Sequence, residues 1–584
     1  MNKIINNPNH LVYEMCKGIE LAHPELQFVE KFKIIKKKNI NKEKVTLISG
    51  GGSGHEPAHA GYVGEGMLDA AVCGDVFASP SQIQVYQAIR ETTSNKGTLL
   101  IIKNYSGDMM NFKNAAHLAK EDGIHIDYVK VDDDIAVQDS LYTVGHRGVA
   151  GTVFVHKIAG ALAEAGKSLQ EVKAVAEKTA QNVKSIGFAF SSCTVPAKGS
   201  PTFDIADDEM EYGVGIHGEP GIEREKIISA NELSSRMVAS LLSALDMTSG
   251  EVALMINGFG STPLQELYVL NHAVYKELVG AGITVHRIFV GNYMTSIDMI
   301  GASVSILKVD DELKMLLNAP CKTPGLSIHG QVSQAEYVPL SIENVSSKPN
   351  DISYEMQTDE VHAIIENERL SLNNLHYLVD AMSECIIRNE VPFCELDAIA
   401  GDGDFGMSIA KGFKRLKSEW NELITTSSSI GEFLESCSLI IMEHCGGASG
   451  PIWGSAFRGA SKFAGNASDL SLMQFADMIQ SSIKAIQNTG ERTFGRGAVV
   501  GDKTLIDALV PFADSLKASA VDQLTFKEAF KLAAASAVEG ANNTKLISAK
   551  MGRAGTVGER SIGHPDAGAQ ALGVIFTELA DLVQ

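Results

Sequence analysis

A change in hydrophobic periodicity near residue 340 is the feature that most restricts the fold of this chain. Before it, short apolar runs alternate with helical patterns; after it, apolar residues recur at helical spacing alone. Strands that alternate with helices favour a largely parallel sheet covered by helices, whereas a helical pattern alone favours an all-α domain. The sequence therefore predicts a multidomain protein with an N-terminal α/β domain and a C-terminal all-α domain.

The predicted domains are residues 1–330 and 361–584, joined by a mostly polar, turn-forming linker at 331–360. In the first domain we expect two α/β subdomains, divided between residues 190 and 250. The predicted strands are residues 45–49, 98–103, 124–131, 185–191, 251–257, 284–290 and 303–309. In the second domain, helical patterns fit residues 372–386, 406–418, 430–442, 455–463, 472–489, 503–516 and 526–540, and no strand is expected.

The composition limits the partners. The net charge of -21 argues against a nucleic-acid partner, because phosphate backbones require patches of Lys and Arg. Phosphorylated small molecules stay compatible, since a bound metal can supply local positive charge. The N-terminus lacks a signal-peptide pattern, and no window of about 18 uncharged apolar residues predicts a membrane span. The eight cysteines are scattered without a Cys-x-x-Cys pair, so we expect a reduced, cytoplasmic protein.

A loop crowded with acids opens the second domain. Asp397, Asp402 and Asp404 fall within eight residues and are interrupted by glycines. Such acids repel one another unless a cation neutralises them, and Mg²⁺ bridges carboxylates to phosphate oxygens. A solvated acidic turn is the alternative. A Ca²⁺ loop fits poorly, because its acids recur at alternate positions, whereas four residues separate the first two acids here.

Three polar loops of the first domain follow or lie between its predicted strands, where open sheets bind ligands. Residues 49–57 read Ser-Gly-Gly-Gly-Ser-Gly-His-Glu-Pro, which predicts either close backbone approach to a ligand or a glycine turn with a structural His55. Residues 103–108 end in Asp108, which is either an acid/base partner of His55 or the N-cap of a helix.

The third loop, residues 211–221, surrounds His217 with glycines and places Glu211 and Glu219 nearby. This setting favours a reactive or hydrogen-bonding histidine over a packing residue, and a metal ligand is also possible. The sequence does not decide which of the two acids orients His217.

The loops of the helical domain are also rich in glycine and polar residues. They cover residues 397–407, 445–451, 497–504 and 553–566. If the helices alternate in direction, these loops gather at one end, where helix N-termini and basic side chains can bind phosphates. Each loop alone is also compatible with a simple helix–helix turn.

These motifs resemble those of the dihydroxyacetone (glycerone) kinases in their single-chain, ATP-dependent form. Gly-Gly-Gly-Ser-Gly-His-Glu-Pro, Lys-Asn-Tyr-Ser-Gly-Asp and Gly-Ile-His-Gly-Glu-Pro-Gly are similar to motifs of the family's substrate-binding K domain. The Asp-x₄-Asp-x-Asp loop, Gly-Gly-Ala-Ser-Gly-Pro, Gly-Asp-Lys-Thr and Gly-Glu-Arg-Ser-Ile-Gly-His-Pro-Asp are similar to motifs of its nucleotide-binding L domain. The resemblance covers nearly the whole chain. It implies ATP-dependent phosphorylation of a short-chain hydroxyketone, with dihydroxyacetone as the first expectation.

The resemblance also implies residue roles. His217 would add to the ketone as a covalent hemiaminal, which excludes polyols such as glycerol, and His55 and Asp108 would act as acid/base residues. It implies an eight-helix barrel for the L domain and a homodimer, in which one chain's L domain serves the other's K domain. Substrate contacts are expected at Gly52, Ser53, Gly54, Lys103 and Asp108, and two Mg²⁺ ions at Asp397, Asp402 and Asp404. ATP contacts are expected at Asp404, Phe405, Gly406, Met407, Gly446, Gly447, Ser449, Gly501, Gly555, Thr556, Gly558 and Arg560.

The chain departs from the family pattern at two places. Phe405 and Met407 replace residues that usually offer polar groups to the nucleotide, and Met109 and Met110 follow Asp108 on the substrate side. The second departure keeps open a four-carbon ketose such as erythrulose. Further alternatives are a lyase that cyclises a ribonucleotide–flavin compound, and a ketose-binding regulator or phosphorelay protein with tightly bound ADP.

Overall fold

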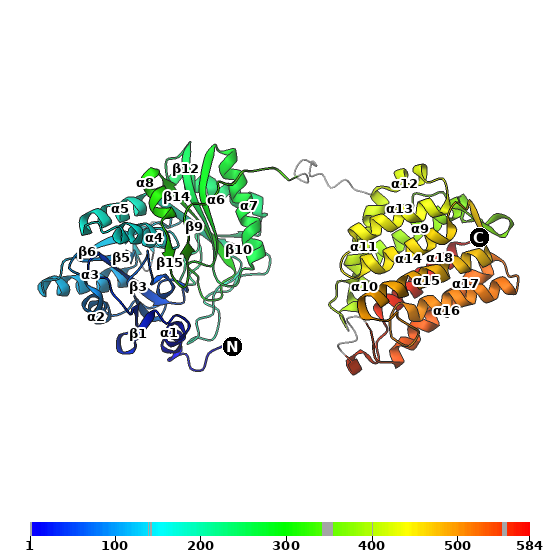
Figure 1. Cartoon of the computed structure of the whole chain (residues 1–584), viewed down its shortest axis with the longest axis horizontal. Coiled ribbons are helices and arrows are strands. Elements are labelled where there is room, and N and C mark those ends of the chain that lie inside the picture. The colour runs from blue at the N-terminus through cyan, green and yellow to red at the C-terminus, as the bar shows by residue number, and fades with distance from the viewer. Residues whose placement is uncertain (1–2, 138, 141–142, 341–353, 400, 552–557) are drawn as a thin grey trace. The chain divides into compact units, whose positions relative to one another are not determined.

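The computed structural model describes residues 3–137, 139–140, 143–340, 354–399, 401–551 and 558–584. The chain forms two compact units, Met1–Asn344 and Val345–Gln584 (Figure 1). The first is α/β and the second is helical, so the predicted fold class is confirmed. Of the predicted linker, residues 341–353 lie outside the described residues. No helix among the described residues combines the length and apolar character needed to cross a bilayer.

The first sheet of the α/β unit has the strand order β1-β2-β4-β3-β5-β6. Strands β4, β3, β5 and β6 are parallel, and β1 and β2 add an antiparallel edge. Every residue of β3 and β5 is buried, which explains their readable apolar runs. The strands are β1 Leu26–Val29, β2 Ile34–Lys37, β3 Thr46–Ser53, β4 Ala70–Val76, β5 Thr98–Lys103 and β6 Ile126–Val131.

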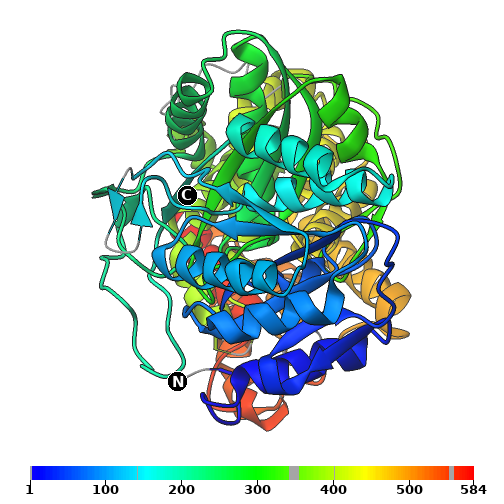
Figure 2. The same ribbon diagram turned by 90° about the vertical axis from the view of Figure 1, so that its left-hand side faces the viewer.

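Helices cover both faces of this sheet (Figure 1, Figure 2). Helices α2 (Gln82–Thr92) and α3 (Ser106–Glu121) share one apolar core with it. Helices α1 (Leu11–Ala22), α4 (Thr152–Glu164) and α5 (Leu169–Asn182) share the core on the other face. The helices are anchored locally, since Ser81 and Ser168 form capping boxes at the starts of α2 and α5.

The second sheet has the order β11-β10-β9-β14-β12-β13, and only its β12–β13 pair is parallel. The prediction of a largely parallel sheet is therefore wrong here. The reason is the connection from β13 to β14, which contains no helix and returns the chain in the opposite direction. The strands are β9 Val183–Ala189, β10 Glu209–Tyr212, β11 Glu223–Lys226, β12 Gly250–Gly258, β13 Ile283–Gly291 and β14 Gly301–Val309.

Helices α6 (Ala230–Ala244) and α7 (Leu264–Gly280) cover one face of the second sheet. The other face shares its core with α4, α5 and α8 (Asp311–Asn318), which also belong to the core of the first sheet. The second sheet begins at Val183, so the division lies before the predicted interval of residues 190–250. Two short hairpins complete the unit: β7 Asp139–Ser140 with β8 Thr143–Val144, and β15 Cys321–Lys322 with β16 Ser327–Ile328.

The helical unit is a closed ring of eight long helices. Each contacts the next in the order α9, α11, α13, α14, α15, α16, α17 and α18, and α18 contacts α9. Their bounds are α9 Leu372–Arg388, α11 Phe405–Ser418, α13 Ile430–His444, α14 Ser449–Ala464, α15 Leu472–Phe494, α16 Ile506–Val521, α17 Phe526–Asn543 and α18 Ala567–Leu582. The shorter helices are α10 Glu390–Asp397 and α12 Trp420–Thr426. One unpredicted strand pair, β17 (Arg369–Ser371) with β18 (Asp469–Ser471), joins two chain segments.

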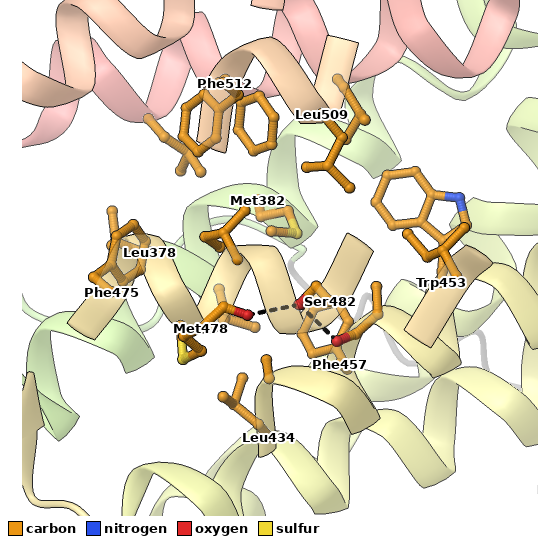
Figure 3. Close-up of a pocket in the computed structure, with 18 of the residues that line it drawn as sticks. Leu378, Met382, Leu434, Trp453, Phe457, Phe475, Met478, Ser482, Leu509 and Phe512 are labelled. Atoms are coloured by element: carbon orange, nitrogen blue, oxygen red, sulfur yellow. Dashed lines mark hydrogen bonds between the residues drawn. The ribbon is translucent and has the colours of Figure 1, made fainter. Parts of the chain in front are cut away.

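The interior of this barrel is apolar. A cavity of about 130 Å³ is lined by aliphatic and aromatic side chains, including Leu378, Trp453, Phe475 and Phe512 (Figure 3). Ser482 is the one hydroxyl residue in this lining, and its Oγ donates to the carbonyl of Ala456 at 2.8 Å. Apart from the Ser482 hydroxyl and the Trp453 indole N–H, the side chains that line the cavity are apolar. The candidate polar site of this unit therefore lies on its loops rather than inside the barrel.

Candidate functional site

Two histidines from distant parts of the α/β unit meet directly. His55 follows β3 and His217 lies on the loop after β10; their Nε2 atoms are 3.2 Å apart. The Nδ1 atom of His55 lies 2.9 Å from the carbonyl oxygen of Thr295. A carbonyl only accepts hydrogen bonds, so Nδ1 of His55 carries the proton and its Nε2 accepts one from His217. The arrangement prepares His55 to remove the Nε2 proton of His217.

Burial keeps both rings neutral. It lowers the pKa of His55 well below the ordinary value of 6.5, and the cation of Lys103 lowers it further. Burial likewise lowers the pKa of His217, with His55, Lys103 and Arg147 adding to the effect. Neutral His217 carries one ring proton, on Nε2, and transfer of that proton to His55 frees the Nε2 lone pair for nucleophilic attack near pH 7.

The glycine-rich loop and the Lys103–Asp108 loop are neighbours, because β3 and β5 pair in parallel. Lys103 is fully buried, and its Nζ lies 3.8 Å from Oδ2 of Asp108. Burial raises the pKa of Asp108, while Lys103 and a hydrogen bond from Ser79 lower it. Tyr105, not Asp108, is the N-cap residue of α3, so the capping alternative for Asp108 is wrong.

The loop between β4 and α2, which the sequence did not single out, supplies two residues of the site. The Phe77 ring stacks on His55, with centroids 5.2 Å apart, and meets His217 edge-on at 5.3 Å. Ser79, on the same loop, lies close enough to Asp108 to lower the pKa of that carboxyl group. Strand β4 reads Ala-Ala-Val-Cys-Gly-Asp-Val and lacks a continuous β-branched run, so it was not recognised. Had it been, the loop at its carboxyl end would have qualified as a ligand-binding loop.

The glycine-rich loop lies close to this missed loop. Gly54 has φ of +107°, and a Cβ atom there would lie 2.8 Å from a Phe77 ring carbon. A Cβ atom on Gly52 would lie 2.7 Å from the Phe77 backbone. The hydroxyl of Ser53 donates to the carbonyl of Gly74 at 2.7 Å, so it ties β3 to β4. Glycine at these positions is therefore needed for Phe77 to reach the histidines.

Tyr105 forms a further wall of the site. Its ring meets His217 edge-on with centroids 4.5 Å apart, and Nζ of Lys103 lies 5.0 Å from the ring centroid. The side chain is 5% exposed, and its hydroxyl has no hydrogen-bond partner among the described residues. The ring of His217 is thus enclosed by His55, Phe77 and Tyr105.

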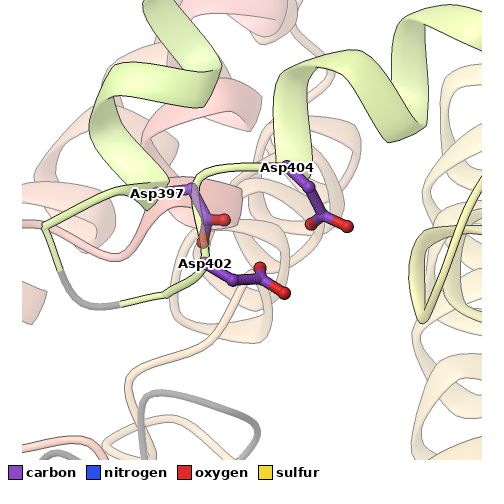
Figure 4. Close-up of side chains that lie close together, drawn as sticks. All are labelled: Asp397, Asp402 and Asp404. Carbon is purple, nitrogen blue, oxygen red and sulfur yellow. The ribbon is translucent and has the colours of Figure 1, made fainter. Parts of the chain in front are cut away.

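The second cluster is the acidic loop of the helical unit. Asp397 ends α10, Asp404 precedes α11, and Asp402 lies between them; one carboxylate oxygen of each lies within 4.8 Å of the others (Figure 4). Burial and the two neighbouring acids raise the pKa of Asp397. A donor set made only of carboxylate oxygens suits a hard divalent cation such as Mg²⁺. The residues therefore fit the expected metal.

A cavity of about 210 Å³ adjoins the three acids. Of the predicted nucleotide-contact residues, Phe405, Gly446 and Ser449 line it together with Asp404. Gly406, Met407, Gly447 and Gly501 do not; a Cβ atom on Gly406 would lie 2.0 Å from the Glu390 carbonyl, which indicates a helix-packing role. Gly555 and Thr556 lie outside the described residues, as do the side-chain surroundings of Gly558 and Arg560.

Lys503 and Asp566, which are not among the residues predicted to contact ATP, also line this cavity. The Lys503 ammonium donates to three backbone carbonyls, of Ile547, Ser561 and His564. These hydrogen bonds hold the segments that contain the three carbonyls next to Lys503. Asp566 caps α18 by accepting from Ala569 N–H at 2.8 Å, and burial raises its pKa to about 7.

Known proteins resemble this chain along its whole length. The Dak1 domain family matches residues 17–325, and the DAK2 domain family matches residues 399–581. The dihydroxyacetone-binding subunit of PTS-dependent dihydroxyacetone kinase 1 from Listeria innocua is 51% identical over 53% of this chain and 95% of that subunit. The L-erythrulose 1-kinase of Mycolicibacterium smegmatis is 32% identical over 100% of this chain and 99% of that kinase. The solved dihydroxyacetone kinase of C. freundii in complex with AMP-PNP and Mg²⁺ is similar with a TM-score of 0.61 and 30% identity, over 99% of both chains.

Proposed function

The chain belongs to the dihydroxyacetone kinase family, and we propose that it transfers the terminal phosphoryl group of ATP to a hydroxyl group of a short-chain hydroxyketone. The observation that carries this proposal is the direct contact of His55 with His217 in a neutral, buried setting. The acidic loop of the helical unit offers three carboxylates that would hold the metal ion of the nucleotide.

The α/β unit binds the ketose in this proposal. His217 Nε2 forms a bond to the ketone carbon, its proton passes to Nε2 of His55, and the carbonyl oxygen becomes a hydroxyl group when His55 returns the proton. The product is a hemiaminal. Glycerol has no electrophilic carbon and cannot be held in this way. Asp108 accepts the proton of the attacking hydroxyl, and the Lys103 ammonium, 3.8 Å from Asp108 Oδ2, favours the ionised form of Asp108 that can accept it.

The helical unit binds the nucleotide. Asp397, Asp402 and Asp404 would hold Mg²⁺, which neutralises the phosphate charges of ATP when bound. The similarity to a kinase solved with AMP-PNP and Mg²⁺ supports this assignment. Phe405 and Ser449 line the adjoining cavity and would contact the nucleotide, Phe405 through its ring and Ser449 through its hydroxyl.

Dihydroxyacetone is the proposed substrate, and erythrulose is the second candidate. The second is favoured by the full-length similarity to an L-erythrulose 1-kinase and by Met109 and Met110, which follow Asp108 directly in α3. We also propose a homodimer in the cytoplasm; sedimentation and fractionation test these two points. All eight cysteines are free in the structure, in keeping with a reducing compartment.

The test is ADP release from ATP and Mg²⁺ with dihydroxyacetone, erythrulose or glycerol as acceptor. We expect turnover with one or both ketoses and none with glycerol. His217→Ala should lose ketose turnover while the protein still binds ATP. Absence of turnover with every acceptor, together with ADP that copurifies with the protein, would instead indicate a regulator or a phosphorelay subunit.

A further inference from the structure

A buried arginine lies beneath the loop that carries His217. Arg147 is 1% exposed, and its guanidinium group makes three different contacts. Nε donates to Asp134 Oδ2 at 2.6 Å, Nη2 to the carbonyl of Gly213 at 2.9 Å, and Nη1 to Glu219 Oε1 at 3.0 Å. The planar guanidinium group fixes these three directions relative to one another. Two of the three partners belong to the His217 loop.

Glu219 connects this arginine to the nucleophile. Its Oε1 accepts from Arg147, and its Oε2 accepts from the backbone N–H of His217 at 2.9 Å. The other candidate acid, Glu211, instead accepts from the N–H of Gly221 at 2.9 Å and from Arg224 at 2.6 Å. The two acids thus hold different parts of the loop, and only Glu219 bonds to His217.

A glycine leaves room for this carboxylate. A Cβ atom at Gly215 would lie 1.9 Å from Oε1 of Glu219 and 2.7 Å from Nη1 of Arg147. No side chain fits at Gly215 while the pair keeps its place. Glycine is therefore required at position 215 by the contact between Glu219 and Arg147.

The energetics argue for positioning rather than for stability. Taking charges out of water costs free energy that a buried ion pair roughly repays, so an apolar replacement of similar size is often as stable. The loop also contains four glycines, at positions 213, 215, 218 and 221, and would otherwise sample many conformations. A contact that joins the His217 N–H to a rigid buried group restricts that freedom at the position where the two Nε2 atoms must stay 3.2 Å apart.

We propose that Arg147 and Glu219 are positioning residues that hold His217 against His55 for addition to the ketone. This inference rests on the proposed function. It assigns no contact with substrate to either residue; both act through the backbone of His217. Loss of their contact should lower the fraction of ketose held as hemiaminal, and leave nucleotide binding on the other unit unchanged.

The experiment uses the full chain with dihydroxyacetone labelled with ¹³C at its carbonyl carbon. Hemiaminal formation moves that resonance from the ketone region to the tetrahedral region. Glu219→Gln keeps the size of the side chain but replaces one of its two accepting oxygens by an NH₂ donor, which then faces the N–H of either Arg147 or His217, so the adduct and kcat/KM should fall about 10- to 100-fold. Glu211→Gln is the matched control on the same loop and should change the adduct less than about 3-fold. Gly215→Ala should reproduce the Glu219→Gln loss, although the charge is kept.

Three outcomes would overturn the inference. Equal adduct in Glu219→Gln and the unmodified protein would exclude a positioning role. Equal losses in Glu219→Gln and Glu211→Gln, with equal drops in melting temperature, would show a general structural role for the loop. Absence of an adduct between the unsubstituted protein and any ketose would overturn both the hemiaminal and the positioning role. This outcome is measured first, before any variant is made, so it is distinguished from the other two.

Discussion

Phe77 offers a quantitative test of the site, because its ring and its backbone make separable contributions. The ring stacks on His55 and meets His217 edge-on. The backbone has φ of +56°, in the left-handed region that side chains with a Cβ atom disfavour. Replacing Phe77 by Ala removes the ring and keeps the backbone strain. Replacing it by Gly removes both.

The two contributions have different magnitudes. Each aromatic pair contributes about 0.5–1.5 kcal/mol, so loss of two pairs amounts to about 1–3 kcal/mol. If those contacts hold the histidines together, both variants should lose about 5- to 160-fold in kcat/KM for a ketose. A residue with a Cβ atom in the left-handed region destabilises the folded state by about 1–2 kcal/mol. Glycine avoids this strain, but the larger conformational freedom that it loses on folding costs about 0.5–1 kcal/mol. The Gly variant should therefore be about 0.5 kcal/mol more stable than the Ala variant.

The assay must separate the two units. Both tryptophans, Trp420 and Trp453, lie in the helical unit, so their fluorescence in urea reports that unit and should not change. Calorimetry of the α/β transition measures the difference between the Ala and Gly variants. An Ala variant that is the more stable of the two would refute the strain argument. Full ketose activity in both variants would refute the role of the ring.

Three further predictions follow from the same geometry. Asp402→Ala should lower turnover about 100- to 1,000-fold through loss of a metal ligand, while the ¹³C adduct with ketose persists; unchanged turnover would exclude the metal assignment. Lys503→Met should remove the donor from three carbonyls, of which the Ser561 carbonyl is buried, and destabilise the helical unit by about 2–4 kcal/mol, measured by tryptophan fluorescence in urea. The folded-state pKa values of His55 and His217 are depressed below 6.5, so below that pH the unfolded chain binds protons that the folded unit does not. As the pH falls below 6.5, the free energy of unfolding of the α/β unit should therefore decrease by up to about 1.4 kcal/mol per pH unit for each such histidine. Equal stability of this unit at pH 7.5 and 5.5, measured by calorimetry, would contradict this.

The parts of the fold that could be predicted are those with a local signal. Strands β3 and β5 are buried along their whole length and read as apolar runs, and the helices of the second unit repeat their apolar residues at helical spacing. Strand direction in the second sheet has no such signal, because it depends on which strands become neighbours. Strand β4 was not predicted, because its residues are mostly small. Phe77, which follows it, was therefore not predicted as a site residue either, since its contacts are with residues distant in the sequence.

The site shows the same division. The spacing of Asp397, Asp402 and Asp404 predicts that the three acids lie together. One carboxylate oxygen of each lies within 4.8 Å of the others, because α10 ends at the first acid and α11 begins after the last. The choice between Glu211 and Glu219 could not be made from the sequence. Both lie near His217 along the chain, and the difference is set by Arg147, a distant residue that only the folded structure places beneath Glu219.

Burial of the two histidines explains several properties of the proposed site together. A solvated imidazole would be partly protonated near its ordinary pKa of 6.5 and would then lack a lone pair. Burial keeps His217 neutral, and the Thr295 carbonyl orients the His55 tautomer that can take its proton. In the proposed reaction, a covalent bond to the ketone carbon would select the substrate by its electrophilic carbon, which hydrogen bonds to hydroxyl groups do not distinguish. The same burial makes the α/β unit less stable as the pH falls below 6.5, so the proposed ketone selectivity and the acid sensitivity of the fold have one physical cause.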